Sequence, residues 1–214
     1  NEELFLSEFA EKIHGVHANN IEISDGNKLY CSVDGVVFSK DKKILVGYPG
    51  SREGSYDIPE GTETIWCEAF KESNLSAVSI PDSVTDIQSY AFAWCNNLTS
   101  VKFGKGIANF SHFMRTSLFS MCKKLHSIEI PSCVDTICED MFSVCPLDKI
   151  ILHEGIKEIK NCAFNNCNIN DITLPDSLKW IGNGNFSNAS IVRVKDRIPY
   201  GLIADLTKRW NDNY

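Results

Sequence analysis

The sequence predicts a repeat solenoid of mixed α/β class, in which short parallel strands stack into one sheet. Three observations lead to this prediction: a short phrase that recurs about every 22–23 residues, an alternation of apolar residues before each copy, and a helix-forming pattern at each end of the chain. A unit of this length cannot bury its apolar face alone, so neighbouring units must supply the core.

The recurring phrase begins with an apolar residue that is usually followed by proline. Seven residues later comes a second apolar residue, and in five of the six units a phenylalanine follows five residues after that. In the third unit Phe119 lies nine residues after Phe110, so this unit carries a four-residue insertion within residues 111–118. The six repeats are expected to occupy residues 56–190, and their leading apolar residues are Ile58, Ile80, Phe103, Ile130, Leu152 and Leu174.

Each unit opens with alternating apolar residues, such as Val78 with Ile80 and Ile128 with Ile130. Alternation over three to five residues indicates a short, half-buried strand, and the Pro or Gly that follows ends it. One such strand per unit, repeated in register, predicts a parallel sheet.

The two ends of the chain are expected to form caps, because a solenoid otherwise leaves an open sheet edge and exposed core. Residues 1–20 are expected to form an N-terminal capping helix. Its polar face is acidic, which favours capping over membrane binding. Residues 191–214 are expected to give a last strand and a helical C-terminal cap. The apolar face of the first helix is made of Phe5, Leu6, Phe9, Ile13 and Val16.

The pattern L-x-x-I-x-I-P-x-x-V-x-x-I-x-x-x-A-F-x-x-C, seen at residues 75–95 and again at 125–145, resembles the BspA-like leucine-rich repeats of bacterial cell-surface proteins of the Bacteroides type. Residues 29–50 look like the β-hairpin insertion that often precedes such repeats, so a strand and hairpin are expected over 21–55. The resemblance implies a right-handed, leucine-rich-repeat-like coil, a place at the cell surface or in the secreted fraction, and adhesion to host or bacterial proteins. Gly104 and His153 depart from the pattern by replacing its proline.

Composition excludes several classes of function. The chain has 28 acidic against 21 basic residues, a net charge of −7, and no basic run, so a nucleic-acid partner is not expected. It also lacks the eighteen or so consecutive apolar residues of a membrane helix, so this segment is not expected to insert directly into a membrane. No phosphate-binding glycine loop, nucleophile motif or converging histidine cluster is present, so we expect no catalytic residues, no cofactor and no enzyme.

The nine cysteines divide into two groups. Four of them lie three residues after a repeat phenylalanine and are expected to stack as one column of buried structural thiols: Cys95, Cys122, Cys145 and Cys167. No metal site is expected, because the five-residue spacings differ from typical zinc pairs. Disulfides between adjacent coils stay open as an alternative for the remaining five, Cys31, Cys67, Cys133, Cys138 and Cys162.

Two surfaces are candidates for partner binding. One is the outward face of the sheet, where a column of mixed charge is predicted, and the other is the insertion in the third repeat, whose loop carries Phe113, Met114 and Arg115. A small, mixed surface of this kind suits a broad protein contact better than a small-molecule pocket. The outward column consists of Lys102, Glu129, Ile151, Thr173 and Arg193.

The function predicted from these features is a non-enzymatic protein-binding or adhesion module. Two alternatives stay open. A glycan-binding accessory protein would stack sugar rings on Trp66, Trp94 and Trp180, and a structural spacer would have no ligand of its own.

Overall fold

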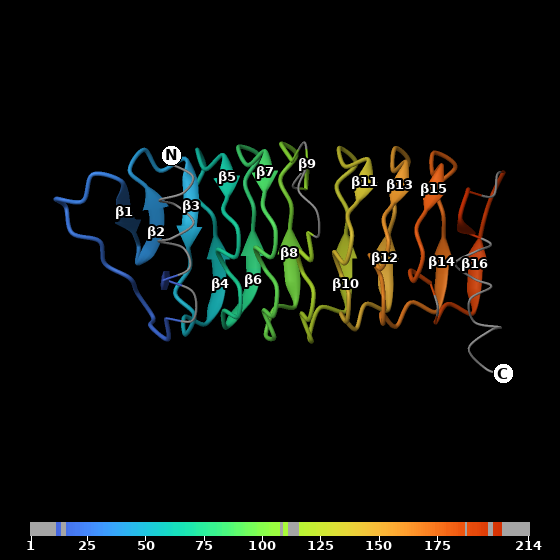
Figure 1. Cartoon of the computed structure of the whole chain (residues 1–214), viewed down its shortest axis with the longest axis horizontal. Coiled ribbons are helices and arrows are strands. Elements are labelled where there is room, and N and C mark those ends of the chain that lie inside the picture. The colour runs from blue at the N-terminus through green and yellow to red at the C-terminus, as the bar shows by residue number, and fades with distance from the viewer. Residues whose placement is uncertain are drawn as a thin grey trace.

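The computed structural model describes residues 12–13, 16–107, 109–110, 116–186, 188–196 and 199–202. Figure 1 shows an elongated stack of coils with strands side by side along the long axis. The predicted solenoid with parallel strands is confirmed. We number its coils 1 to 6 by their repeat phenylalanines, in the order Phe70, Phe92, Phe119, Phe142, Phe164 and Phe186.

Seven strands form the face predicted from the apolar alternation. Their inward residues pair in register across coils, with Val78 opposite Val101 and Ile128 opposite Ile150. Hydrogen-bonded ladders join β4 to β6 to β8, β10 to β12, and β14 to β16, all parallel. The strands are β4 (Gly54–Asp57), β6 (Leu75–Ser79), β8 (Ser100–Lys102), β10 (Ser127–Glu129), β12 (Lys149–Ile151), β14 (Asp171–Thr173) and β16 (Ile191–Arg193).

The prediction of one strand per repeat is wrong, because each coil also pairs at the apolar residue seven positions further on. These second strands hold two residues each and form the parallel ladders β5-β7-β9 and β11-β13-β15. A two-residue strand is too short to show alternation, so the apolar alternation that predicted the first ladder could not predict the second. The second strands are β5 (Thr64–Ile65), β7 (Asp86–Ile87), β9 (Asn109–Phe110), β11 (Thr136–Ile137), β13 (Glu158–Ile159) and β15 (Trp180–Ile181).

An antiparallel unit precedes the coils and joins this second ladder. It consists of β1 (Tyr30–Val33), β2 (Val36–Ser39) and β3 (Ile44–Gly47), and β3 pairs in parallel with β5. Asp34 and Gly35 connect β1 to β2 with φ of 48° and 75°, as a tight two-residue hairpin requires. The hairpin therefore continues the solenoid along β5.

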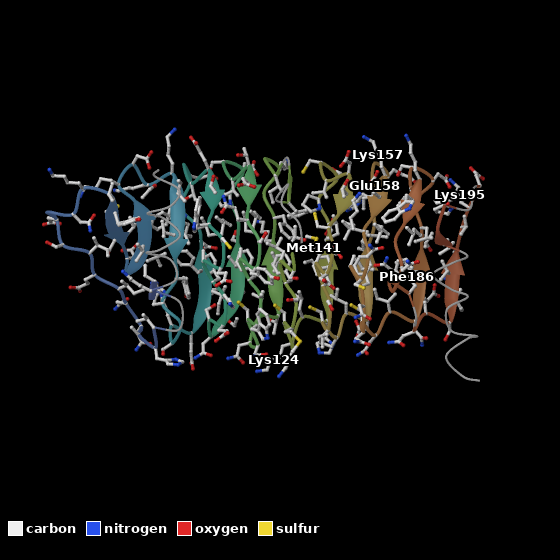
Figure 2. The ribbon with its side chains drawn as sticks, in the orientation of Figure 1. Lys124, Met141, Lys157, Glu158, Phe186 and Lys195 are labelled. Atoms are coloured by element: carbon white, nitrogen blue, oxygen red, sulfur yellow. The ribbon has the colours of Figure 1, made fainter. Side chains whose placement is uncertain are left out.

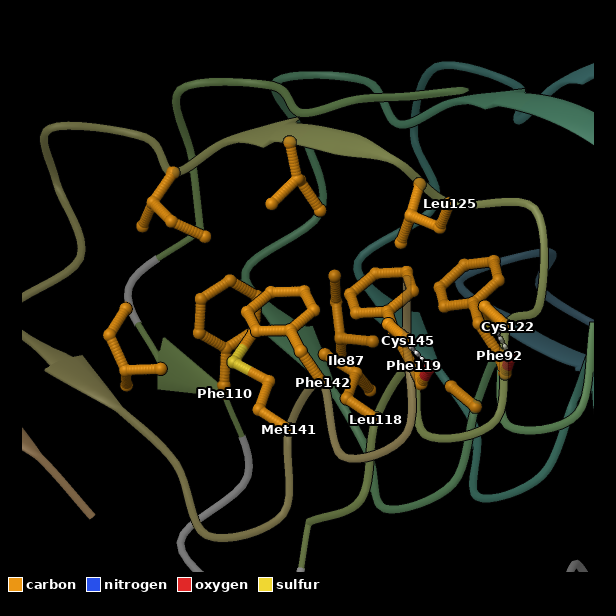
Figure 3. Close-up of a cluster of buried hydrophobic side chains, with 14 of the residues drawn as sticks. Ile87, Phe92, Phe110, Leu118, Phe119, Cys122, Leu125, Met141, Phe142 and Cys145 are labelled. Atoms are coloured by element: carbon orange, nitrogen blue, oxygen red, sulfur yellow. Dashed lines mark hydrogen bonds between the residues drawn. The ribbon is translucent and has the colours of Figure 1, made fainter. Parts of the chain in front are cut away.

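The core is a column of stacked aromatic rings. Tyr48 begins it, the six repeat phenylalanines follow, and neighbouring ring centroids lie 4.8–5.7 Å apart. Figure 3 shows Phe92, Phe119 and Phe142 in this stack, with the thiols of Cys122 and Cys145 beside them. Because each ring contacts the rings of the neighbouring coils, burial of one coil depends on its neighbours.

The turn that carries each phenylalanine forms a third ladder. The N–H of Phe92 donates to the Leu118 carbonyl at 3.0 Å, and the N–H of Phe119 donates to the Met141 carbonyl at 2.8 Å. Residues two before and two after the phenylalanine have positive φ in coils 1 to 5. These residues are Glu68 and Glu72, Tyr90 and Trp94, Ser117 and Met121, Asp140 and Val144, and Cys162 and Asn166.

Coils 3 and 4 are joined less completely than coils 1 and 2. Among the described residues, neither β8 with β10 nor β9 with β11 forms a ladder, and the turn ladder alone supplies regular hydrogen bonds there. The four-residue insertion lies in coil 3, between Phe110 and Leu118. The first ladder is also interrupted between β12 and β14.

Helical caps are not supported. Within the described ranges, helix is limited to Lys12, Ile13 and Leu202, and the other residues of both predicted cap helices mostly lie outside those ranges. At the C-terminal end the chain adds one more rung, since the N–H of Ile181 donates to the Tyr200 carbonyl at 2.9 Å. In the part of the chain that the structure describes, no helix is long and apolar enough to cross a membrane.

Candidate functional site

The outward face of the first ladder brings the predicted column together. Glu129 lies opposite Ile151, and Thr173 lies opposite Arg193, in the strand registers. On β8, the strand before β10, Lys102 lies opposite Ser79 of β6. All five predicted residues are exposed, and Ile151 keeps 46% of its surface accessible. Their side chains point outward because Val101, Ile128, Ile150, Ile172 and Val192 alternate with them and pack inward.

A second outward column runs beside the first. It includes Ser127 opposite Lys149, and Asp171 opposite Ile191. Ile191 is exposed to 47%, similar to Ile151. The two isoleucines are the large apolar side chains on an otherwise polar face, and they lie on opposite sides of β14.

Ion pairs bridge neighbouring strands of this face. Arg193 pairs with Asp171 between β16 and β14. His153 Nε2 lies 3.2 Å from Glu129 Oε1, and His126 Nδ1 lies 3.6 Å from Asp148 Oδ2. His153 stands in the proline position of the repeat, and its ring there contacts the carboxylate of the preceding coil. These exposed pairs orient side chains more than they stabilise the fold.

Lys102 and Lys149 differ from the other charged residues of the face. Both are exposed, and neither has a carboxylate partner among the described residues. Lys102 lies on β8 and Lys149 on β12, the two strands that flank β10. Their ammonium groups are therefore available to a binding partner.

A shallow cavity of about 260 Å³ opens on this face where β8 and β10 are not hydrogen-bonded to each other. Its walls combine hydroxyl groups, one ammonium, one carboxylate and the side chain of Ile151. This cavity could not be predicted from the sequence, because no residue pattern indicates that two neighbouring strands are separated. The lining residues are Thr99, Ser100, Val101, Ser127, Ile128, Glu129, Lys149 and Ile151.

The second candidate surface, Phe113, Met114 and Arg115, lies outside the described residues. Thr116, which follows it, is described: its hydroxyl donates to the Glu139 carbonyl at 2.9 Å.

None of the nine cysteines forms a disulfide in this structure. The four column thiols are buried, and each donates to the carbonyl of a phenylalanine in the preceding coil at 2.9–3.2 Å. Ser73 holds the same place in coil 1, 3.5 Å from the sulfur of Cys95. Burial raises the pKa of Cys67 to about 11 and that of Cys167 well above its ordinary value. Such thiols are poor nucleophiles and poor metal ligands.

The three tryptophans considered for glycan stacking do not form one row. Trp66 follows β5 and packs against both hydrophobic clusters. Trp94 lies in a turn, with Lys71 Nζ at 5.4 Å from its ring centre and Tyr90 stacked at 6.3 Å. Trp180 lies in β15, with Lys160 Nζ at 5.3 Å. The three rings therefore make no continuous aromatic surface along the described coils.

Comparison with known proteins identifies the repeats. The sequence model of the BspA-type leucine-rich repeat region matches residues 54–154 and 112–197, with six copies. No protein in the curated set matches the chain.

Solved structures share the fold. A leucine-rich repeat protein of Eubacterium ventriosum is 23% identical, with a TM-score of 0.64 over 87% of this chain and 57% of that one. A leucine-rich cell surface protein of Faecalibacterium prausnitzii is 25% identical, with a TM-score of 0.56 over 86% and 42%. The leucine-rich repeat protein of T. pallidum is 23% identical, with a TM-score of 0.66 over 90% and 95%.

The chain thus spans about half the length of the first two of these proteins. The family match covers more than half of the chain and coincides with the coils seen in the structure. The chain belongs to the BspA-type leucine-rich repeat family.

Proposed function

We propose that this chain is a non-enzymatic protein-recognition module of a bacterial surface or secreted protein, and that it binds through the sheet face from β8 to β16. One observation carries the proposal: the exposed column Lys102, Glu129, Ile151, Thr173 and Arg193 crosses five neighbouring strands beside a shallow cavity. The description of the F. prausnitzii protein as a cell surface protein supports the location.

The chemistry of the face favours a protein partner. Ile151 provides an apolar centre, and the serines offer hydroxyl groups. Lys102 and Lys149, which have no carboxylate partner within the described ranges, provide two cationic contacts. A contact with a small apolar centre and a polar rim is typical of protein interfaces. The strand registers fix the spacing of these side chains along the face.

Binding to a panel of purified host matrix proteins and of surface proteins from neighbouring bacteria tests the proposal. Each protein is immobilised, and saturable binding of the chain is measured by biolayer interferometry. Ile151→Asp places a charge at the centre of the face, and we expect it to weaken binding by about tenfold or more. The Ile151→Asp variant and the control variant described next must both have the melting temperature of the wild type.

Leu29→Asp is the matched control, because Leu29 is 48% exposed, close to the 46% of Ile151, but lies next to β1 at the other end of the molecule. We expect it to bind as the wild type does. No saturable binding to any member of the panel would favour the spacer function. Equal losses in the two variants would place the binding surface elsewhere.

A further inference from the structure

An apolar row crosses the turns on the Phe–Cys side of the solenoid. Trp94, Met121 and Val144 hold the same position in coils 2, 3 and 4, two residues after the repeat phenylalanine. The turn ladder fixes their register, since the N–H of Trp94 donates to the Ser120 carbonyl and the N–H of Met121 to the Ser143 carbonyl, both at 2.9 Å. Val144 is 39% exposed, and Trp94 and Met121 are half-buried.

The backbone at this position disfavours such side chains. The three residues have φ of 58°, 64° and 62°, in the left-handed region that glycine and asparagine adopt most readily. Val144 is β-branched, which makes its conformation a true outlier. Coil 5 has Asn166 at this position, with φ of 54°, so the chain itself contains the residue that the conformation favours.

Packing does not explain the choice of these residues. The core beneath them is already filled by the phenylalanine stack and the column thiols. Trp94 stacks on Tyr90, but Val144 belongs to neither buried cluster. Three successive coils thus carry an apolar side chain at a strained position, exposed in Val144 and half-buried in Trp94 and Met121, and this indicates a surface kept for contact with another molecule.

The charge beside the row identifies the kind of partner. Lys123 and Lys124 follow Met121 by two and three residues, and both are exposed. Lys124 Nζ bonds to the Asn97 amide oxygen at 2.8 Å, and no carboxylate pairs with either lysine among the described residues. In Figure 2, Lys124 lies at the edge of the molecule opposite Lys157 and Glu158. Lys71 lies over the Trp94 ring but pairs with Glu68 at 3.1 Å, so Lys123 and Lys124 are the cations that the row offers to a partner.

We infer that Trp94, Met121 and Val144, flanked by Lys123 and Lys124, form a second docking surface, and that its occupant is a protein segment with apolar anchors flanked by Asp or Glu. The apolar side chains fill the contact along the row, while the lysines attract the carboxylates. This surface is separate from the sheet face, so its failure and that of the proposed function are distinguishable.

A stability experiment tests whether the row has a structural role. Val144→Asn replaces a strained residue with the one found in coil 5, and we expect a melting temperature that is equal or higher by about 2–4 °C. Asn166→Val is the reciprocal control, and we expect it to lower the melting temperature by a similar amount. A clear loss of stability in Val144→Asn would show that the side chain supports the fold, and would overturn the inference.

A binding experiment tests the partner. A random dodecapeptide display library is selected on the wild-type chain and counter-selected on the Met121→Asn/Val144→Asn double variant. We expect enriched peptides with an aromatic or leucine anchor flanked by Asp or Glu, binding about tenfold weaker to the double variant and weakened by salt.

Three outcomes would overturn the inference. They are the absence of enrichment, enrichment of peptides with basic or uncharged flanks, and enriched peptides that bind both proteins equally. Sedimentation of the wild type is measured in parallel. A dimer that the double variant abolishes would assign the row to a second copy of this chain and exclude the acidic segment as its occupant.

Discussion

The thiol of Cys145 donates a hydrogen bond to the carbonyl oxygen of Phe119 in the preceding coil, at a sulfur–oxygen distance of 2.9 Å. The same carbonyl accepts the N–H of Cys122 at 3.3 Å, so both of its acceptor sites are used inside the core. The cysteine column therefore links coil to coil through polar contacts as well as packing. This explains why a small hydrogen-bond donor recurs at the position.

Cys145→Ala should lower the free energy of unfolding by about 1–2 kcal/mol, because it removes a buried hydrogen bond and leaves a small void. Cys133→Ala is the control, because Cys133 is exposed, and it should change stability by less than about 0.5 kcal/mol. Urea unfolding with an unchanged m-value measures both. Equal effects of the two substitutions would mean that the column thiol adds no link between coils.

Thiol labelling should follow burial. At pH 8 the exposed Cys133 should react first with a disulfide reagent, while the column thiols should react only after unfolding. Labelling of Cys67 should rise as the pH approaches its pKa of about 11, because the thiolate is the nucleophile. All nine thiols should titrate in denaturant without reductant, and a smaller number would reveal a disulfide.

The join between coils 3 and 4 should be the least protected part of the sheet. β6 has hydrogen-bonded neighbours on both sides, whereas β8 and β10 each have one. Amide hydrogens over residues 126–130 should therefore exchange faster than those over 76–80, by roughly tenfold. Peptide-resolved hydrogen–deuterium exchange measures this difference. Equal protection would imply that the two strands pair in solution.

The pair of Lys157 with Asp135 should add a small, pH-dependent stability. Hydrogen bonding to Lys157, at 3.0 Å, lowers the pKa of Asp135 below its usual 3.8. A carboxyl group whose pKa is lower in the folded state stabilises the fold at pH values above its unfolded-state pKa. This stabilisation is lost as the pH falls through the folded-state pKa. Lys157→Met should thus destabilise at pH 7, by less than about 1 kcal/mol because both groups are half exposed, and have no effect near pH 2.

Lys179→Met is the matched control for this pair. Lys179 follows Lys157 along the same row, and its N–H donates to the Lys157 carbonyl at 2.8 Å, yet its side chain has no carboxylate partner among the described residues. Its substitution should leave the pH dependence of urea unfolding as in the wild type. A pH-dependent loss in Lys179→Met of the same size would attribute the effect to general charge.

The repeat made much of this fold predictable. Residues such as Val78 and Phe92 recur at fixed positions, and a recurring residue must occupy a recurring environment, so the sheet, the ring column and the buried cysteines could be read without a structure. The outward column from Lys102 to Arg193 followed from the same register, because side chains alternate between the faces of a strand.

Three features could not be predicted from the pattern. Two-residue strands such as Thr64–Ile65 are too short to show alternation. The missing ladder between β8 and β10 depends on how the backbones of coils 3 and 4 pack against each other. The left-handed turns were hidden because Trp94 and Val144 stand where glycine or asparagine would have signalled a positive φ.

Binding of a protein to the sheet face should leave a footprint on the backbone amides of its strands. Hydrogen–deuterium exchange is compared with and without a partner identified from the binding panel. We expect added protection over residues 99–103, 126–130 and 148–152, which carry Lys102, Glu129 and Ile151. Added protection over the turns or the hairpin, with exchange at these strands unchanged, would contradict it.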